Sequence, residues 1–138
     1  MNNKRGFTLV EIMIVVAIIA ALAAISIPNL LRARLNSNET TAQANLKTVA
    51  SALEMYSASN NGTYPTAESD LTSPNPPYLN KSFEACTSSD PCQGYVYSYS
   101  SLTEGGYCVQ ATPAQVGVTG QNTYSITTGS VLTPNSCS

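Results

Sequence analysis

The feature that most constrains this chain is a run of apolar residues near its N-terminus. Between Phe7 and Ile27 the only polar side chains are Thr8, Glu11 and Ser26. A helix of this length spans roughly 31 Å at about 1.5 Å per residue, which is enough to cross the hydrocarbon of a bilayer. We therefore expect a transmembrane helix here, with the remainder of the chain folding outside the hydrocarbon.

The residues that flank the apolar run predict its orientation. Lys4 and Arg5 directly precede it, and basic flanking residues stay on the cytoplasmic side of a membrane. The N-terminus is therefore expected in the cytoplasm, and everything after Ile27 is expected outside it.

The four cysteines support an exported C-terminal region, since all of them fall in the last two-fifths of the chain: Cys86, Cys92, Cys108 and Cys137. An even number of cysteines in a small, loop-rich, exported chain indicates disulfides, whereas zinc sites favour C-x-x-C pairs or added histidines. Four cysteines allow three pairings, and the residues alone do not choose among them. We expect Cys86 to pair with Cys92 and Cys108 with Cys137.

The composition disfavours several classes of function. Charged residues make up 10% of the chain and the formal net charge is −2, so no basic surface is expected to bind nucleic acid. The chain has no histidine, which removes the commonest general base and a common metal ligand. The scattered acids Glu84, Asp90 and Glu104 lack the spacing of a calcium-binding motif. We expect no metal, no cofactor and no catalysis.

The sequence after the apolar run predicts that the helix continues as an amphipathic one. Pro28 lacks an N–H and should kink or loosen the helix without ending it. Beyond it an apolar stripe recurs at helical spacing, while Glu39 and Glu54 take other positions. Asn60, Asn61 and Gly62 are expected to end the helix. The stripe consists of Leu31, Leu35, Ala42, Leu46, Val49, Leu53 and Tyr56.

The remaining sequence predicts a connector followed by a small sheet. Residues 63–93 are rich in proline and small polar residues, which indicates an irregular segment. Segments 94–101, 106–112 and 123–132 alternate in polarity and are separated by glycine-containing turns, so they read as antiparallel strands. The expected fold class is α+β, with the long helix packed on the sheet. The connector should pack on the helix through Tyr64, Leu71, Tyr78, Leu79 and Phe83.

The segment from Lys4 to Glu11, KRGFTLVE, followed by an apolar run and Pro28, resembles the N-terminus of type IV prepilins and type II secretion pseudopilins. The resemblance implies that a prepilin peptidase cuts between Gly6 and Phe7 and methylates the new amine of Phe7. It also implies that Glu11 pairs with that amine and that Phe7, Glu11 and Pro28 take part in assembly. The later NNGTYP, residues 60–65, is similar to the end of the long helix in the same family.

On this resemblance the chain is organised in four parts. They are a cleaved leader (1–6), a transmembrane and polymerisation helix (7–28), an amphipathic half of the helix (29–62) and a disulfide-bonded head (63–138). The implied partners are other copies of the chain, the prepilin peptidase, an inner-membrane assembly platform, minor pilins and, before assembly, the lipid bilayer. The implied locations are the bacterial inner membrane for the precursor and an extracellular pilus for the mature subunit.

Several other interpretations compete with a pilus subunit. A secretory signal peptide has a shorter apolar run and no internal acid, and a plain membrane anchor leaves Gly6, Glu11 and Pro28 unexplained. A pseudopilin of a type II secretion system fits the same N-terminal motif. A membrane-tethered enzyme would need a nucleophile and a base that the sequence does not supply. The disulfides favour the pilus subunit over the pseudopilin, because a surface fibre meets shear and proteases outside the cell.

Overall fold

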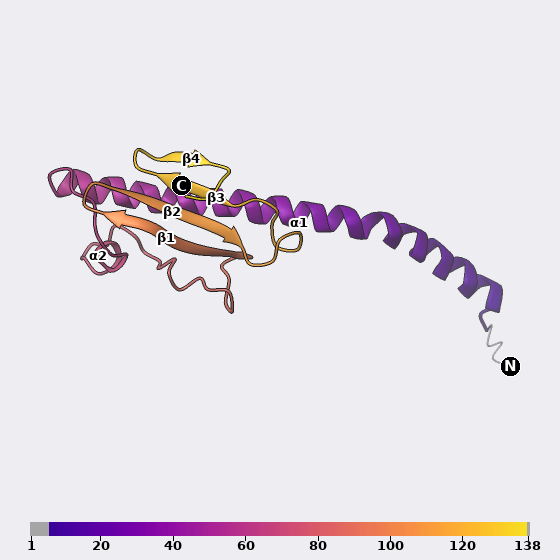
Figure 1. Cartoon of the computed structure of the whole chain (residues 1–138). Helices are drawn as coiled ribbons and strands as arrows, with labels where there is room; N and C mark the ends of the chain where they lie inside the picture. Colours follow the sequence, from indigo (N-terminus) through magenta and orange to yellow (C-terminus); the bar gives the residue numbers. More distant parts are fainter. Residues whose placement is uncertain (1–5, 138) are drawn as a thin grey trace. The chain divides into compact units, whose positions relative to one another are not determined.

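A computed structural model describes residues 6–137 of the chain (Figure 1). Helix α1 (Leu9–Ser59) is the longest element, and a short helix α2 (Ser69–Thr72) and four strands follow it. The chain divides into two units, and the boundary between Ala33 and Arg34 falls within α1. Lys4 and Arg5, which belong to the expected leader, lie outside the described residues.

The N-terminal unit contains the first half of α1. Its leucine, isoleucine, alanine and methionine residues favour helix, and the helix continues through Pro28 as expected. Polar side chains near the proline bond to the helix itself. The Ser26 hydroxyl donates to the Leu22 carbonyl at 2.9 Å, and the Asn29 amide donates to the Ile25 carbonyl at 3.1 Å.

The second half of α1 belongs to the C-terminal unit, where its apolar stripe is buried. Leu46, Val49 and Leu53 have no exposed surface, and Leu35 and Ala42 are also buried. The expected stripe was wrong at Leu31, which is 46% exposed and belongs to the N-terminal unit. It was also too narrow, since the buried face includes Ala50, Ala52 and Ser57.

The end of α1 has the geometry of a Schellman motif. Asn61 adopts a left-handed conformation with φ 55°, and the Gly62 amide donates to the Ser57 carbonyl at 2.8 Å. The prediction that Asn60, Asn61 and Gly62 end the helix is confirmed.

The connector is largely irregular, as predicted, but it also contains α2, which the sequence analysis missed. Leu71 of α2 is fully buried, and Leu79 and Phe83 are almost fully buried. The other two expected contacts, Tyr64 and Tyr78, are partly buried against the same core. This segment therefore contributes to the core although it has little regular structure.

The sheet has four antiparallel strands in the order β1-β2-β3-β4, with bounds Tyr95–Thr103, Gly106–Pro113, Tyr124–Thr127 and Val131–Thr133. In β1, Tyr95 and Tyr97 are buried while Ser98 is exposed, which confirms the predicted alternation. The third predicted segment is in fact two strands. Gly129 and Ser130 have φ of 82° and 60°, so the chain turns between β3 and β4.

The core of the C-terminal unit lies between the sheet and the second half of α1 (Figure 1). The sheet contributes Tyr95, Val109 and Ile126, each with no exposed surface. The predicted α+β arrangement, a long helix packed on a small antiparallel sheet, is confirmed.

Candidate functional site

The residues of the N-terminal motif lie at and just before the start of α1. Gly6 and Phe7 are exposed and precede the helix, and the Phe7 side chain is 84% exposed. A Cβ added at Gly6 would meet no atom within 4 Å, so packing within this chain does not require a glycine there. The residue type at position 6 therefore has no explanation in the fold of the chain itself.

Thr8 and Glu11 form a reciprocal cap at the first turn of α1. The Thr8 amide and hydroxyl donate to Glu11 Oε2 at 2.7 and 2.8 Å, and the Glu11 amide donates to Thr8 Oγ1 at 3.2 Å. This is a capping box, in which each side chain satisfies an amide that the helix leaves free. The sequence analysis missed it, although the spacing T-x-x-E before an apolar run is its signature.

The expected pairing of Glu11 with the Phe7 amine remains a prediction. Phe7 is here an internal residue whose nitrogen lies in the peptide bond to Gly6. In this structure the carboxylate of Glu11 instead accepts hydrogen bonds from the amide and hydroxyl of Thr8.

The helix that follows presents apolar side chains to its surroundings. From Leu9 to Leu31 its large apolar residues are 46% to 75% exposed. The most apolar window of α1 has a mean hydropathy of 2.8 and none of it is buried, so α1 is long and apolar enough to cross a membrane. This surface has no partner among the described residues of the N-terminal unit.

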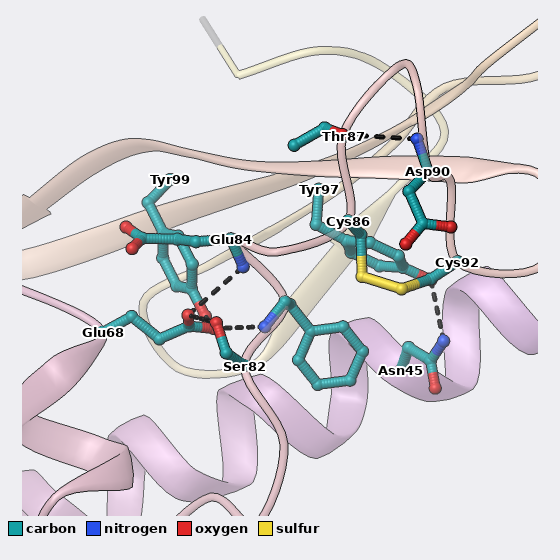
Figure 2. The surroundings of a disulfide bond; sticks show 11 residues. Asn45, Glu68, Ser82, Glu84, Cys86, Thr87, Asp90, Cys92, Tyr97 and Tyr99 are labelled. Carbon is teal, nitrogen blue, oxygen red and sulfur yellow. Dashed lines mark hydrogen bonds between the residues drawn. A yellow bond between two sulfur atoms is a disulfide. The ribbon is translucent and has the colours of Figure 1, made fainter.

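The cysteines form two disulfides, Cys86–Cys92 and Cys108–Cys137, and none of the four is free. The first closes a loop of the connector beside β1 (Figure 2). The second spans 29 positions and attaches the C-terminal segment to β2. This is the pairing that the sequence analysis favoured.

A buried carboxylate, Glu68, joins the connector to the sheet (Figure 2). Glu68 is 2% exposed and accepts from the Phe83 amide at 2.7 Å and the Tyr99 hydroxyl at 2.6 Å. The Ser82 hydroxyl and the Glu84 amide also donate to it. Burial and this hydrogen bond raise the pKa of Tyr99. A carboxylate surrounded by neutral donors is thus accommodated without a cation.

Glu54 anchors the hairpin between β3 and β4 to α1. Its carboxylate accepts from the hydroxyls of Tyr64 and Tyr107 at 2.9 Å and from the Gly129 amide at 3.0 Å. Burial is the main cause that raises the pKa of Tyr107 to about 12, and the bond to Glu54 acts in the same direction.

Glu39 similarly anchors the segment before β3. It accepts from the Gln121 amide at 2.8 Å and the Tyr124 hydroxyl at 3.0 Å. Burial opposes its ionisation, but the hydrogen bonds from Gln121, Tyr124 and Asn122 outweigh burial and lower the pKa of Glu39. The sequence analysis placed Glu39 and Glu54 only outside the apolar stripe and did not assign them this role, because a carboxylate on a helix gives no signal of its distant partners.

No candidate metal centre emerges from the part of the chain that the structure describes, residues 6–137. Within it, no three His, Cys, Asp or Glu side chains are close enough together to hold a metal ion. The acids Glu84, Asp90 and Glu104 do not form such a group.

Residues 1–27 match the family model described as a prokaryotic N-terminal methylation motif. The chain is 52% identical over 61 residues to the type IV wide pilus major component PilA4 of Thermus thermophilus, covering 44% of this chain and 47% of that protein. It is 50% identical over 54 residues to the type IV major pilin protein PilA of Myxococcus xanthus, covering 39% and 24%.

A further relative is the type II secretion system core protein G of Pectobacterium carotovorum, 40% identical over 69 residues, covering 50% of this chain and 44% of that protein. The chain thus spans about half or less of the length of these curated relatives. The methylation motif at residues 1–27 and these relatives show that the chain is similar to type IV pilins and to type II secretion pseudopilins.

Proposed function

We propose that this chain is a structural subunit of a type IV pilus. A prepilin peptidase cleaves it between Gly6 and Phe7 and methylates the Phe7 amine. The subunit is held in the bacterial inner membrane by its first helical half, with the C-terminal unit outside. It then joins other copies, through an inner-membrane assembly platform and with minor pilins, in an extracellular filament.

The observation that carries this proposal is the arrangement of the N-terminal unit. An exposed glycine and phenylalanine precede a capped helix whose apolar side chains have no partner in their own unit. Gly6 has no packing role within the chain, which favours recognition by another protein. The apolar surface would be covered by lipid before assembly and by helices of other copies afterwards.

Intact-mass analysis of the protein recovered from sheared surface fibres tests the processing step. The expected mass corresponds to a chain that begins at Phe7 and carries one added methyl group. A mature protein that still begins at Met1, or that begins after Ala23 as a signal peptidase product would, contradicts the proposal.

Two substitutions of Glu11 separate its capping role from its charge. Glu11→Gln keeps a side chain that can complete a capping box, whereas Glu11→Val removes the cap and the charge together. If the carboxylate pairs with the Phe7 amine, both variants insert into the membrane and neither assembles efficiently. Normal assembly of Glu11→Gln in cells that lack the parent protein would assign Glu11 to capping alone.

A pseudopilin is the second candidate, because core protein G of type II secretion systems is among the relatives. Deletion of the gene distinguishes the two. Loss of surface fibres with normal secretion of folded exoproteins supports the pilus subunit, and intact fibres with trapped exoproteins support the pseudopilin. A tethered enzyme is the least supported candidate, since the relatives named above are pilus and secretion components.

A further inference from the structure

The two edge strands of the sheet, β1 and β4, differ in how open they are to pairing with a further strand. β4 has three residues and is followed by Pro134, and a short edge strand that ends at a proline offers little to a new strand. β1 has nine residues, YVYSYSSLT, with no charge and no proline. A long uncharged edge strand rich in tyrosine and valine favours pairing with other chains. β1 therefore needs a form of protection that β4 does not.

The first half of β1 is covered by residues 86–92 of the connector, here named the edge cover. Gln93 and Gly94 have φ of 52° and 83° and form a tight turn, which brings Cys92 beside Tyr95. The Cys92 amide donates to the Tyr95 carbonyl at 2.9 Å, and the Tyr95 amide donates to the Cys92 carbonyl at 3.1 Å. The edge cover thus occupies backbone groups that a new strand would bond.

The other end of the edge cover lies at the next outward position of β1. The Tyr97 amide donates to the Cys86 carbonyl at 3.4 Å, a longer bond than those at Cys92. Between the cysteines the chain forms an exposed loop whose hydrogen bonds join Thr87 and Asp90. The disulfide Cys86–Cys92 is therefore the covalent restraint that keeps both ends of the edge cover at β1 (Figure 2).

The second half of β1 is interrupted by an irregularity. The register with β2 shifts between Tyr99 and Ser101, and a bulge of this kind bends an edge strand and breaks its row of outward backbone groups. Alternate residues of an antiparallel strand point their backbone groups to the same side. The row that begins at Tyr95 and Tyr97 therefore continues at Tyr99 and ends at the bulge.

This row of three tyrosines is complementary to itself. An antiparallel pair centred on Tyr97 places Tyr95 of one copy opposite Tyr99 of a second copy, and allows up to about six backbone hydrogen bonds. No side chain of β1 is charged, so no like charges oppose the pairing. Such a contact uses the same surface of both copies and closes after two.

We propose that the edge cover, closed by Cys86–Cys92, keeps β1 from pairing with β1 of a second copy, and that the C-terminal unit dimerises through these strands while the two cysteines are unpaired. The inference concerns the C-terminal unit alone and does not depend on the proposed function. A dimer that closes on itself adds no further copies at β1, so the edge cover keeps subunits available for an open assembly.

Removal of one disulfide at a time from the full-length chain tests the proposal. The open variant, Cys86→Ser with Cys92→Ser, is compared with the control variant, Cys108→Ser with Cys137→Ser, which keeps the edge cover closed. For a sequence separation of 6, the chain-entropy model makes opening about 40-fold more frequent without the disulfide.

Sedimentation velocity in detergent measures the self-association of both variants. The open variant should dimerise at a concentration at least about 40-fold lower than the parent chain, because opening must precede pairing. The control variant should sediment like the parent chain. Equal self-association of the two variants overturns the proposal, as does an open variant that sediments like the parent chain.

A charge on β1 identifies the surface that pairs. Ser98 is exposed on the face of the sheet opposite the core. Adding Ser98→Lys to the open variant should restore the sedimentation of the parent chain, because the two lysines of a dimer would lie about 7 to 8 Å apart as diagonal neighbours. Ser98→Gln, which is long and uncharged, should leave the dimer intact. Dimers of the open variant that persist with Ser98→Lys overturn the assignment to β1.

Amide hydrogen exchange locates the new hydrogen bonds. In the open variant the exchange of the Tyr97 and Tyr99 amides should slow as the protein concentration rises, since these amides then donate to a second copy. In the parent chain their exchange should not depend on concentration. A dimer of the open variant without this slowing contradicts pairing at β1.

Reduction of the control variant provides a reversible test in one chain. Its remaining disulfide exchanges with dithiothreitol, which leaves two thiols on the chain and a cyclic disulfide in the reagent. Dimers should appear on reduction and disappear on reoxidation. Loss of the near-UV tyrosine signal of the open variant without dimerisation overturns the proposal, because it assigns Cys86–Cys92 to the stability of the unit and not to covering its edge.

Discussion

The two halves of α1 differ in where their apolar side chains find partners. In the N-terminal unit Leu22 is 62% exposed and Ile14 is 56% exposed, whereas in the C-terminal unit Leu46 and Leu53 have no exposed surface. A single helix thus serves two purposes. One half depends on an apolar environment that the unit does not provide, and the other half is covered by the sheet of its own unit.

This difference shows that forming the helix and burying its apolar side chains depend on different interactions in this chain. The first half needs only intrahelical bonds, a cap and lipid or neighbouring helices. The second half needs partners at particular positions, and the anchors Glu39, Glu54 and Glu68 supply them together with the apolar core.

The largest expected effect tests this contrast with one leucine from each half. Leu53→Ala leaves a cavity in the core and should lower the free energy of unfolding of the C-terminal unit by about 2 to 5 kcal/mol. Leu22→Ala should leave it unchanged. The tyrosine signal in near-UV circular dichroism in detergent reports on this unit alone, since all eight tyrosines lie at or after Tyr56. Equal destabilisation by both changes would contradict the conclusion that only the second half of α1 is buried within its own unit.

Each disulfide should contribute to the stability of the C-terminal unit according to the length of the loop that it closes. Removing Cys108–Cys137 by paired serine substitutions is expected to cost about 3.6 kcal/mol, and removing Cys86–Cys92 about 2.2 kcal/mol. The difference follows from sequence separations of 29 and 6. Denaturant titration of the two double variants measures it, and a reversed order would show that unfolded-chain entropy does not dominate.

The carboxylates of Glu68 and Glu11 extend the comparison between the two units. Glu68→Gln removes a buried carboxylate that accepts four hydrogen bonds. The change should lower the free energy of unfolding of the C-terminal unit by about 1.5 to 3 kcal/mol. Glu11→Gln alters a carboxylate that bonds only to its neighbour Thr8 and should not change the same melting curve. Thermal unfolding followed through the tyrosines distinguishes them, and equal melting temperatures would contradict the role given to Glu68.

Raising the pH should weaken the C-terminal unit by a smaller and gradual amount. The pKa of Tyr107 is raised to about 12 in the folded protein, above its ordinary value of 10.0. The neutral hydroxyl of Tyr107 is therefore favoured by the folded state. Its contribution to the free energy of unfolding is fully present below about pH 10 and is lost as the pH rises toward about 12. Tyrosinate absorbance and the melting temperature should change together and recover at neutral pH. Loss of stability that begins below about pH 9 would point to another group.

The sequence predicted well whatever depends on residues near one another in the chain. The apolar run, the end of the helix at Asn61 and Gly62, and the alternation of Tyr95 and Tyr97 all follow from local patterns. The split of the third strand segment was missed, although Gly129 and Ser130 carry a local turn signal.

The anchors were harder to predict because their partners are far away in the sequence. Glu54 reaches Gly129 across 75 positions, and Glu39 reaches Tyr124 across 85. The periodic pattern of apolar residues along the sequence gives no information about contacts at such separations. At the N-terminus the opposite holds, since the capping box of Thr8 and Glu11 could be predicted from their spacing alone. It was missed because Glu11 was assigned only to the expected pairing with the Phe7 amine.

The absence of basic residues after Lys81 also bears on how well the C-terminal unit resists proteolysis. Lys81 is the last basic residue of the chain, so proteases that cleave after lysine or arginine have no target bond anywhere in β1 to β4. Folded proteins open locally and briefly, and a cleavable bond is cut during such an opening. Here even an opened sheet offers these proteases nothing to cut. The lack of lysine and arginine therefore protects the four strands from these proteases independently of how stably the C-terminal unit folds.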